Sequence, residues 1–283
     1  MTLPIVAPLL PEDVNLIERS QFWQTQRLDV IQTSMGPVLV KAQRLQRHPI
    51  RYAMLSALAW LLRLPMIKAA PAPGGSDAQN IEVLRLQALR QAGVQVPAVL
   101  HSAQNWFAME YIDAPNLLGS LQSEVEISER LSMWLQAAKA LGHVHARGQA
   151  LSQAFARNCL WHHGEIWFID FEDDPVSVMP LEQAQARDWL AYFYSTVWAL
   201  RQCQVSWDHL LSKYELISQI YSEPVAQIIQ ETGARMAWLR HLPTSRKPWG
   251  RDVITLQMLG EFLYRSGKRQ AEIANKAEST STH

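Results

Sequence analysis

A short hairpin signal in the middle of the chain places two oxygen-bearing side chains at one end of a pair of strands. Residues 159–161 and 166–169 are apolar runs typical of strands, and residues 162–165 supply the turn between them. Such a hairpin brings the Asn158 amide and the Asp170 carboxylate together, although they are 12 residues apart in the chain. A carboxylate and a neutral oxygen donor suit a Mg²⁺ ion that keeps several waters and also binds nucleotide phosphates. The sequence therefore predicts a magnesium site at this end of the hairpin.

Length and composition permit a large core and argue against some partners. A chain of 283 residues with 48% hydrophobic and 18% charged residues can form one large domain or two lobes around a cleft. The 26 basic and 26 acidic residues cancel, so that no global field favours nucleic acid or anionic lipid. The 11 Trp residues lack the basic interleaving of a stacking surface. We therefore expect no nucleic-acid partner.

Cysteine usage and the first residues indicate the cellular compartment. Cys159 and Cys203 lie in apolar surroundings and lack the spacing of metal ligands, so we expect two buried thiols in a reducing cytosol. Residues 1–10 are apolar but have no basic leader, and acidic residues follow at once, so we expect no signal peptide. The sequence thus predicts a cytoplasmic protein.

The segment 49–67 qualifies this picture because it is apolar with basic flanks. Between Arg51 and Arg63 it has 11 residues without a charge, whereas a membrane-crossing helix needs about 20. One interpretation is a peripheral helix on the anionic inner face of a bacterial membrane, or one that grips a lipid-like substrate. The alternative is a helix that packs on its own domain.

Strand signals dominate the first part of the chain and helix signals dominate the second. A helix with Asn80 as its cap and Gly93 as its stop separates two sets of predicted strands. The expected elements, in order, are a helix near 11–23, strands at 27–32 and 37–41, a linker at 69–79, a helix at 80–92, strands at 99–100 and 106–111, a helix at 125–147, the hairpin, and helices from 181 onward.

Particular residues in these elements resemble a known family. Lys41 ends a predicted strand, and Glu82 opens a helix whose spacing of Leu86, Leu89 and Gly93 is the most specific part of the match. The chain resembles the bacterial lipopolysaccharide-kinase group, the small kinase-like proteins related to heptose and Kdo kinases, over roughly residues 25–200. The resemblance implies that Lys41 contacts ATP phosphates and that Glu82 pairs with it. From the residues alone, the alternatives are that Lys41 is a solvated edge charge and that Asn158 simply caps a turn.

Further positions follow the same pattern. Residues 109–112 resemble the hinge whose backbone receives adenine, with Glu110 and Ile112 as the implied cofactor contacts. His145 resembles the structural histidine before the catalytic loop, and Asp188 resembles the aspartate that braces this loop from below. The resemblance implies bound ATP and Mg²⁺, with Asn158 and Asp170 as the metal ligands.

The implied fold class is α+β, a two-lobed protein-kinase-like fold with a small strand-rich N-lobe, one key helix, and a mainly helical C-lobe. The expected parts are an N-terminal arm (1–25), the N-lobe (26–112, with an insertion at 43–79), the C-lobe (113–270) and a disordered tail (271–283).

Three departures from the family pattern concern catalysis. Gln153 stands where the catalytic loop usually has its Asp, and Gln cannot accept a proton at neutral pH. Glu172 stands where a Gly would follow Asp-Phe, and only Gly36 lies in the first strands, which therefore lack G-x-G. Asp173 and Asp174 could supply a relocated base or metal ligand, or could merely shape a loop before Pro175.

Three functions therefore remain open. The first is a phosphotransferase that acts on a sugar, lipid or protein hydroxyl with an atypical catalytic loop. The second is a nucleotide-binding pseudokinase that acts as a switch or scaffold. The third is a membrane-surface interaction protein that retains only the fold. The sequence leaves open whether phosphate is transferred at all.

Overall fold

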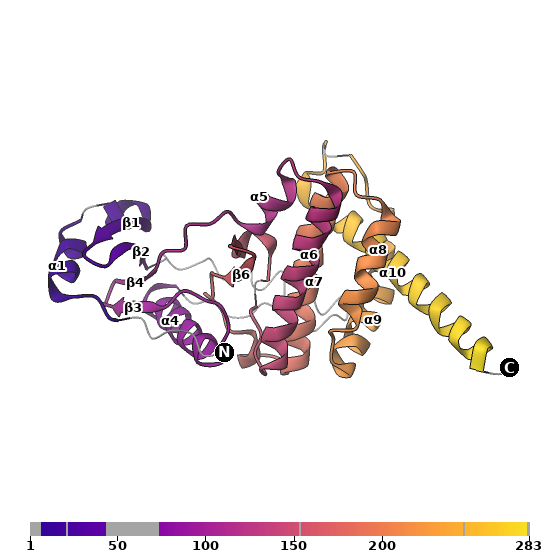
Figure 1. Cartoon of the computed structure of the whole chain (residues 1–283), viewed down its shortest axis with the longest axis horizontal. Helices are drawn as coiled ribbons and strands as arrows, with labels where there is room; N and C mark the ends of the chain where they lie inside the picture. Colours follow the sequence, from indigo (N-terminus) through magenta and orange to yellow (C-terminus); the bar gives the residue numbers. More distant parts are fainter. Residues whose placement is uncertain (1–6, 21, 44–73, 153, 246, 282–283) are drawn as a thin grey trace.

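The computed structural model describes residues 7–20, 22–43, 74–152, 154–245 and 247–281. A small part with a sheet and a larger part made of helices lie next to each other along the long axis (Figure 1). The apolar segment 49–67, with its two alternative interpretations, lies outside the described residues. Of the helices in the described ranges, none is both long and apolar enough to cross a bilayer.

The N-terminal sheet has four antiparallel strands in the order β1-β2-β4-β3. Their bounds are Leu28–Thr33 for β1, Gly36–Ala42 for β2, Val99–Ser102 for β3 and Trp106–Glu110 for β4. Alternation in β2 directs Val38 and Val40 into a small core that also contains Trp106 and Ile17. Gly36, with φ of 103°, makes the tight turn between β1 and β2 that the sequence predicts.

Helices flank this sheet, and two of them differ from prediction. The helix expected near 11–23 is in fact two helices, α1 (Pro11–Arg19) and α2 (Phe22–Gln26), because Ser20 adopts an extended conformation that ends α1. α4 (Gly75–Gln91) begins five residues before the expected Asn80 cap, with Gly74 as its N-cap. Burial of Ala78 and Gln79 extends the packed face of α4 toward its N-terminus, so part of the expected linker is helical.

The C-terminal part consists mainly of helices around one short hairpin. The elements are α5 (Leu117–Gln122), α6 (Ile127–Ala146), η2 (Ala156–Asn158), β5 (Cys159–His162), β6 (Glu165–Phe168), η3 (Pro175–Ser177), α7 (Leu181–Gln202), α8 (Trp207–Ser218), α9 (Glu223–Met236), η4 (Ala237–His241) and α10 (Arg251–Ser281). The helix expected at 125–147 corresponds to α6, and the expected helix from 181 corresponds to α7.

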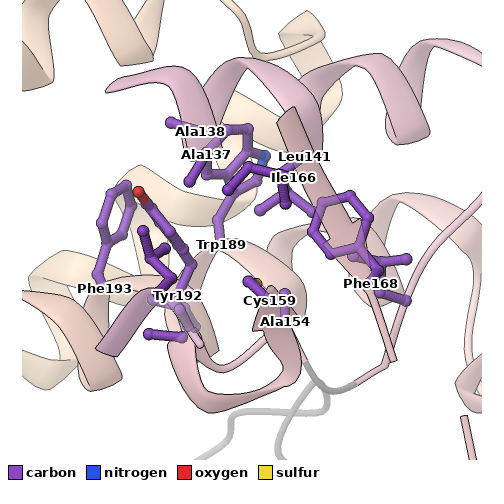
Figure 2. Packing of buried hydrophobic residues seen from close by; sticks show 14 of the residues in the cluster. Ala137, Ala138, Leu141, Ala154, Cys159, Ile166, Phe168, Trp189, Tyr192 and Phe193 are labelled. Carbon is purple, nitrogen blue, oxygen red and sulfur yellow. The ribbon is translucent and has the colours of Figure 1, made fainter. Parts of the chain in front are cut away.

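A large core joins the hairpin to the long helices. Trp189 and Phe193 of α7 pack against Ala138 and Leu141 of α6, and Phe168 of β6 lies beside them (Figure 2). These side chains are almost completely buried, with Trp189 at 1% exposure and Phe193 at 0%. The hairpin therefore packs on the helices through this core, which positions the residues at its end.

The prediction of a disordered tail is wrong for residues 271–281, because these residues continue α10. This stretch contains Ala271, Glu272, Ala274 and Lys276 and no Gly or Pro, so it has favourable helix propensity. Glu272 also lies 3.9 Å from Lys268 on the same helix face. Figure 1 shows this end of α10 extending beyond the other helices.

The two thiols differ in exposure. Both cysteines are free, but only Cys159 is buried, and Cys203 is partly exposed. The prediction of two buried thiols is therefore wrong for Cys203. Burial, together with the negative charge of Asp188, raises the pKa of Cys159.

We therefore expect a thiol reagent at pH 8 to modify at most one cysteine rapidly in the native protein and both in denaturant. Cys203→Ser should remove the rapid reaction, because the remaining thiol is buried and protonated. Rapid modification of this variant would show that the Cys159 region opens readily. The measurement follows the rate of colour release by the thiol reagent, with and without denaturant.

Candidate active site

Lys41 and Glu82 form a buried ion pair between the sheet and α4. Their side chains are 7% and 3% exposed, and the Lys41 Nζ lies 2.7 Å from the Glu82 Oε1. β2 supplies the lysine and α4 the glutamate, and the helix reaches the sheet because it packs against β3 and β4. The ion pair expected from the sequence is present, and a solvated edge position for Lys41 is excluded. That Lys41 contacts the phosphates of ATP remains a prediction.

The Lys41 ammonium also faces two carboxylates from the C-terminal part. Its Nζ lies 3.3 Å from the Asp170 Oδ1 and 3.3 Å from the Glu172 Oε1. Burial disfavours the charged amine, but Glu82, Asp170 and Glu172 outweigh this effect, so the pKa of Lys41 is raised. For the Glu82 carboxyl group, burial also disfavours the charged form and therefore raises its pKa, although the positive charge of Lys41 opposes this. The lysine is thus a firmly charged cation at the junction of both parts of the chain.

The hairpin brings Asn158 and Asp170 to one end, as the sequence predicts. Cys159 pairs with Phe168 at this end of the ladder, and the Ile169 N–H donates to the Asn158 carbonyl over 2.9 Å. At the other end, both turn residues have positive φ, 49° at His163 and 83° at Gly164. Such a two-residue turn matches the twist of the strands and sets their register.

Asp170 has an unusual backbone conformation, with φ of 71°. A non-glycine residue in this region is uncommon, and such strain concentrates at functional sites. Its carboxylate is 34% exposed, whereas Asn158 is buried. Asp170 therefore offers an oxygen toward the space around Lys41.

The donor set fits Mg²⁺ better than a transition metal. Among the described residues there is no group of three or more His, Cys, Asp or Glu side chains that could hold a metal by themselves. Mg²⁺ does not need one, because it usually binds one or two carboxylates together with water and substrate phosphates. The proximity of Asp170 and Lys41 suits this shared coordination. Magnesium binding by Asn158 and Asp170 remains a prediction.

Asp188 organises the loop that precedes the hairpin. It is fully buried at the start of α7, and its Oδ2 accepts a 2.6 Å hydrogen bond from the Leu151 N–H and lies 3.1 Å from the His145 Nε2. The guanidinium of Arg85, on α4, donates to the Ala150 carbonyl in the same loop. Gln153 itself lies outside the described residues. The contacts of Asp188 match the bracing role that the resemblance implies.

The two extra acids both have local partners. Asp174 accepts a 3.2 Å hydrogen bond from the Val176 N–H and so caps η3. Asp173 is buried and its Oδ2 lies 4.0 Å from the Arg187 guanidinium. The structure thus supplies a structural role for each, and a role in catalysis remains a prediction.

The predicted hinge directly follows β4. The Glu110 carboxylate contacts Arg90, at 3.7 Å, and accepts from the Ala98 N–H at 3.3 Å. Beyond it, the Ile112 carbonyl accepts from the Ala114 N–H over 3.0 Å. This segment connects the sheet to α5, which is where the hinge was expected. The binding of adenine by Glu110 and Ile112 remains a prediction.

Arg27 is a residue of this site that no sequence pattern indicates. Its guanidinium pairs with Glu172, so that Arg27 and Lys41 both contact the same carboxylate oxygen, the Oε1 of Glu172. Glu172 is buried, with a side chain only 4% exposed. The one sequence signal that could have revealed the Arg27–Glu172 pair was Glu172 itself, an acidic residue at a position where the family pattern has Gly.

Comparisons with known proteins agree with this geometry. Residues 76–190, less than half of the chain, match the sequence profile of the RIO domain (RIO1), which belongs to the atypical part of the protein-kinase-like superfamily. The fold is kinase-like. A small antiparallel sheet precedes a mostly helical part, as the α+β prediction requires. The lipopolysaccharide-kinase group, which is a finer assignment, remains a prediction.

Solved structures and curated proteins add little to this assignment. A mutant of the Mycobacterium tuberculosis PknI kinase domain is similar to this chain at 14% identity, with a TM-score of 0.34 over 62% of this chain and 74% of that one. The comparison with curated proteins found no match.

Proposed function

We propose that this protein binds Mg²⁺·ATP between its sheet and its helical part and transfers the terminal phosphoryl group to a hydroxyl of a sugar, lipid or protein. One observation carries the proposal: the Lys41 ammonium lies 2.7 Å from Glu82 and 3.3 Å from Asp170. Kinases need both the lysine–glutamate pair and a magnesium-binding aspartate in place. The kinase-like fold supports the same conclusion.

The residues at the end of the hairpin fit the metal that such a reaction uses. Asp170 and Asn158 would hold Mg²⁺, which neutralises charge that develops on the phosphates. Lys41 would orient the phosphates from the side of the sheet, and Asp188 would keep the loop at 150–152 in place through its hydrogen bond to Leu151. Glu110 and Ile112 would offer backbone groups to adenine.

A second function, that of a nucleotide-binding pseudokinase, has a specific observation in its favour. Gln153 cannot serve as a base, and the carboxylates of Asp173 and Asp174, the candidates for a relocated base, already have structural partners. A protein of this kind would bind Mg²⁺·ATP and act as a switch or scaffold. The transferase proposal stands beside it because phosphoryl transfer depends mostly on positioning and charge neutralisation.

The acceptor that we propose is a glycolipid hydroxyl, on the strength of the sequence resemblance to lipopolysaccharide kinases. The protein would then work in the cytoplasm at the inner face of a bacterial membrane. The basic flanks of the segment 49–67, Arg51 and Arg63, suit such a surface.

ATP with Mg²⁺ is expected to raise the melting temperature. A ligand that binds only the native state at 100 times its Kd adds about 2.7 kcal/mol, or roughly 5–10 °C for a chain of this size. Lys41→Ala and Asp170→Ala should each remove most of this shift, because they delete the phosphate and metal contacts. The measurement is differential scanning fluorimetry with ATP, with and without Mg²⁺.

Lys139→Ala is the matched control, because Lys139 is an exposed lysine on α6 whose loss should leave the shift unchanged. A wild-type protein that shows no shift with millimolar Mg²⁺·ATP would refute the proposed function. An equal loss of shift in the Lys139 variant would show that the effect is nonspecific.

A further inference from the structure

Arg27 lies beside Lys41 because of strand pairing. It immediately precedes β1, and its carbonyl accepts a 2.7 Å hydrogen bond from the Ala42 N–H at the end of β2. In the same ladder Leu28 pairs with Lys41. Two cations therefore lie side by side, one on the residue before β1 and one near the end of β2, and both contact the Oε1 of Glu172.

The backbone conformation of Arg27 is energetically costly. Its φ of 61° lies in the left-handed region, which costs a non-glycine residue energy and persists only where the surrounding structure imposes it. Its buried Nε has no hydrogen-bond partner among the described residues. Its side chain is 33% exposed, against 7% for Lys41, so Arg27 is the more accessible of the two cations.

The charge balance around Lys41 makes a second cation useful. Lys41 and Arg27 face the carboxylates of Glu82, Asp170 and Glu172, which leaves one net negative charge. A Mg²⁺ ion on Asp170 would reverse this sign and admit a polyphosphate. Without Arg27 the same metal would only neutralise the cluster, so the attraction for phosphate would be weaker.

The first strands also lack the backbone donors that usually cover the phosphates in kinases. Gly36 is the only glycine there, and it lies in the open β1–β2 turn, where an added Cβ would meet no heavy atom within 4 Å. A guanidinium carries several N–H donors in a planar fork that matches phosphate oxygens. Arg27 can therefore supply the donors that a glycine-rich loop would provide.

We propose that Arg27 is a second phosphate-binding cation, which works with Lys41 on the terminal phosphates of ATP, and that Glu172 holds both cations in position. This inference rests on the proposed function, because it assigns a further residue to the same nucleotide site. Phosphate oxygens that reach the two cations would share or replace the contacts of Glu172.

The test compares three ligands by isothermal titration calorimetry. Arg27→Gln is expected to weaken Mg²⁺·ATP binding about 10- to 100-fold, since hydrogen bonds to charged groups are worth that much. The loss should be smaller for Mg²⁺·ADP and less than about twofold for adenosine, which has no phosphate. Arg27→Lys should retain part of the ATP affinity, because it keeps the charge but loses the fork.

Arg19→Gln is the matched control, because Arg19 is an exposed arginine at the end of α1 and should leave all three affinities unchanged. Melting temperatures check that each variant folds, and Arg27→Lys gives the answer if Arg27→Gln does not fold. Wild-type affinity for ATP in folded Arg27→Gln, or equal losses for ATP and adenosine, would overturn the inference alone. A wild-type protein that binds no Mg²⁺·ATP would instead overturn the proposed function.

Discussion

Gln153→Asp is expected to raise the rate of phosphoryl transfer by about 10²- to 10⁴-fold, the usual worth of a general base. The new carboxylate would stand at the position where kinases accept the proton of the attacking hydroxyl. The neighbouring loop is already held by hydrogen bonds from Leu151 to Asp188 and from Arg85 to Ala150. The measurement is release of labelled phosphate from ATP, with and without a glycolipid acceptor.

Gln153→Asn is the matched control, because it has the shape of Asp without a basic oxygen. If Asp173 or Asp174 is the base in the wild-type protein, Gln153→Asp should change the rate little, and Asp173→Asn or Asp174→Asn should abolish the existing activity. A protein that binds Mg²⁺·ATP and stays inert in every variant would be a pseudokinase, and the transferase proposal would then be wrong.

Gly260→Ala should destabilise the protein strongly through the contact of α10 with η4. A Cβ at this position would lie 2.6 Å from the Leu239 Cβ, 2.7 Å from the Arg240 nitrogen and 2.9 Å from the Leu239 carbonyl carbon. Two of these atoms are backbone, so η4 must shift. We expect overpacking to cost about 3 kcal/mol and the better helix propensity of Ala to offset about 1 kcal/mol. The net loss of about 2 kcal/mol should lower the melting temperature by roughly 4–8 °C.

Gly267→Ala is the matched control on the same helix. Gly267 is exposed, and no heavy atom lies within 4 Å of an added Cβ. The substitution should therefore stabilise the protein by up to about 1 kcal/mol through helix propensity alone. Thermal unfolding followed by circular dichroism distinguishes the two variants, and a Gly260 variant as stable as wild type would show that α10 does not pack closely on η4.

The site combines a conventional part with an unusual one. Lys41, Glu82 and Asp170 have the contacts that a kinase-like site requires. Glu172 differs, because its carboxylate lies where the family pattern has no side chain and contacts both Lys41 and Arg27. In the proposed function this carboxylate makes nucleotide binding depend on the metal. Three carboxylates face two cations, so the site repels phosphate until Mg²⁺ is bound.

Local patterns predicted much of the fold. The hairpin at 159–168 was found because two short apolar runs on either side of turn residues specify a two-stranded ladder within a few residues. α6 and α7 were found because their apolar residues recur at helical spacing over many turns. The errors lie at the α1–α2 break, the start of α4 and the end of α10, because the boundaries of elements are the part that a local pattern specifies least.

The sequence by itself determined most of the elements and the pairing of Lys41 with Glu82, because strand and helix periodicity and a family pattern carry that information. Only the tertiary structure decided which charges meet. Arg27 and Glu172 are 145 residues apart, and no local pattern links them. Likewise the contact of Asp173 with Arg187 became visible only once the loop was folded against α7. The physical reason is that side-chain charges act through space over a few ångströms, so their effect depends on how distant strands and loops are brought together by packing of the core.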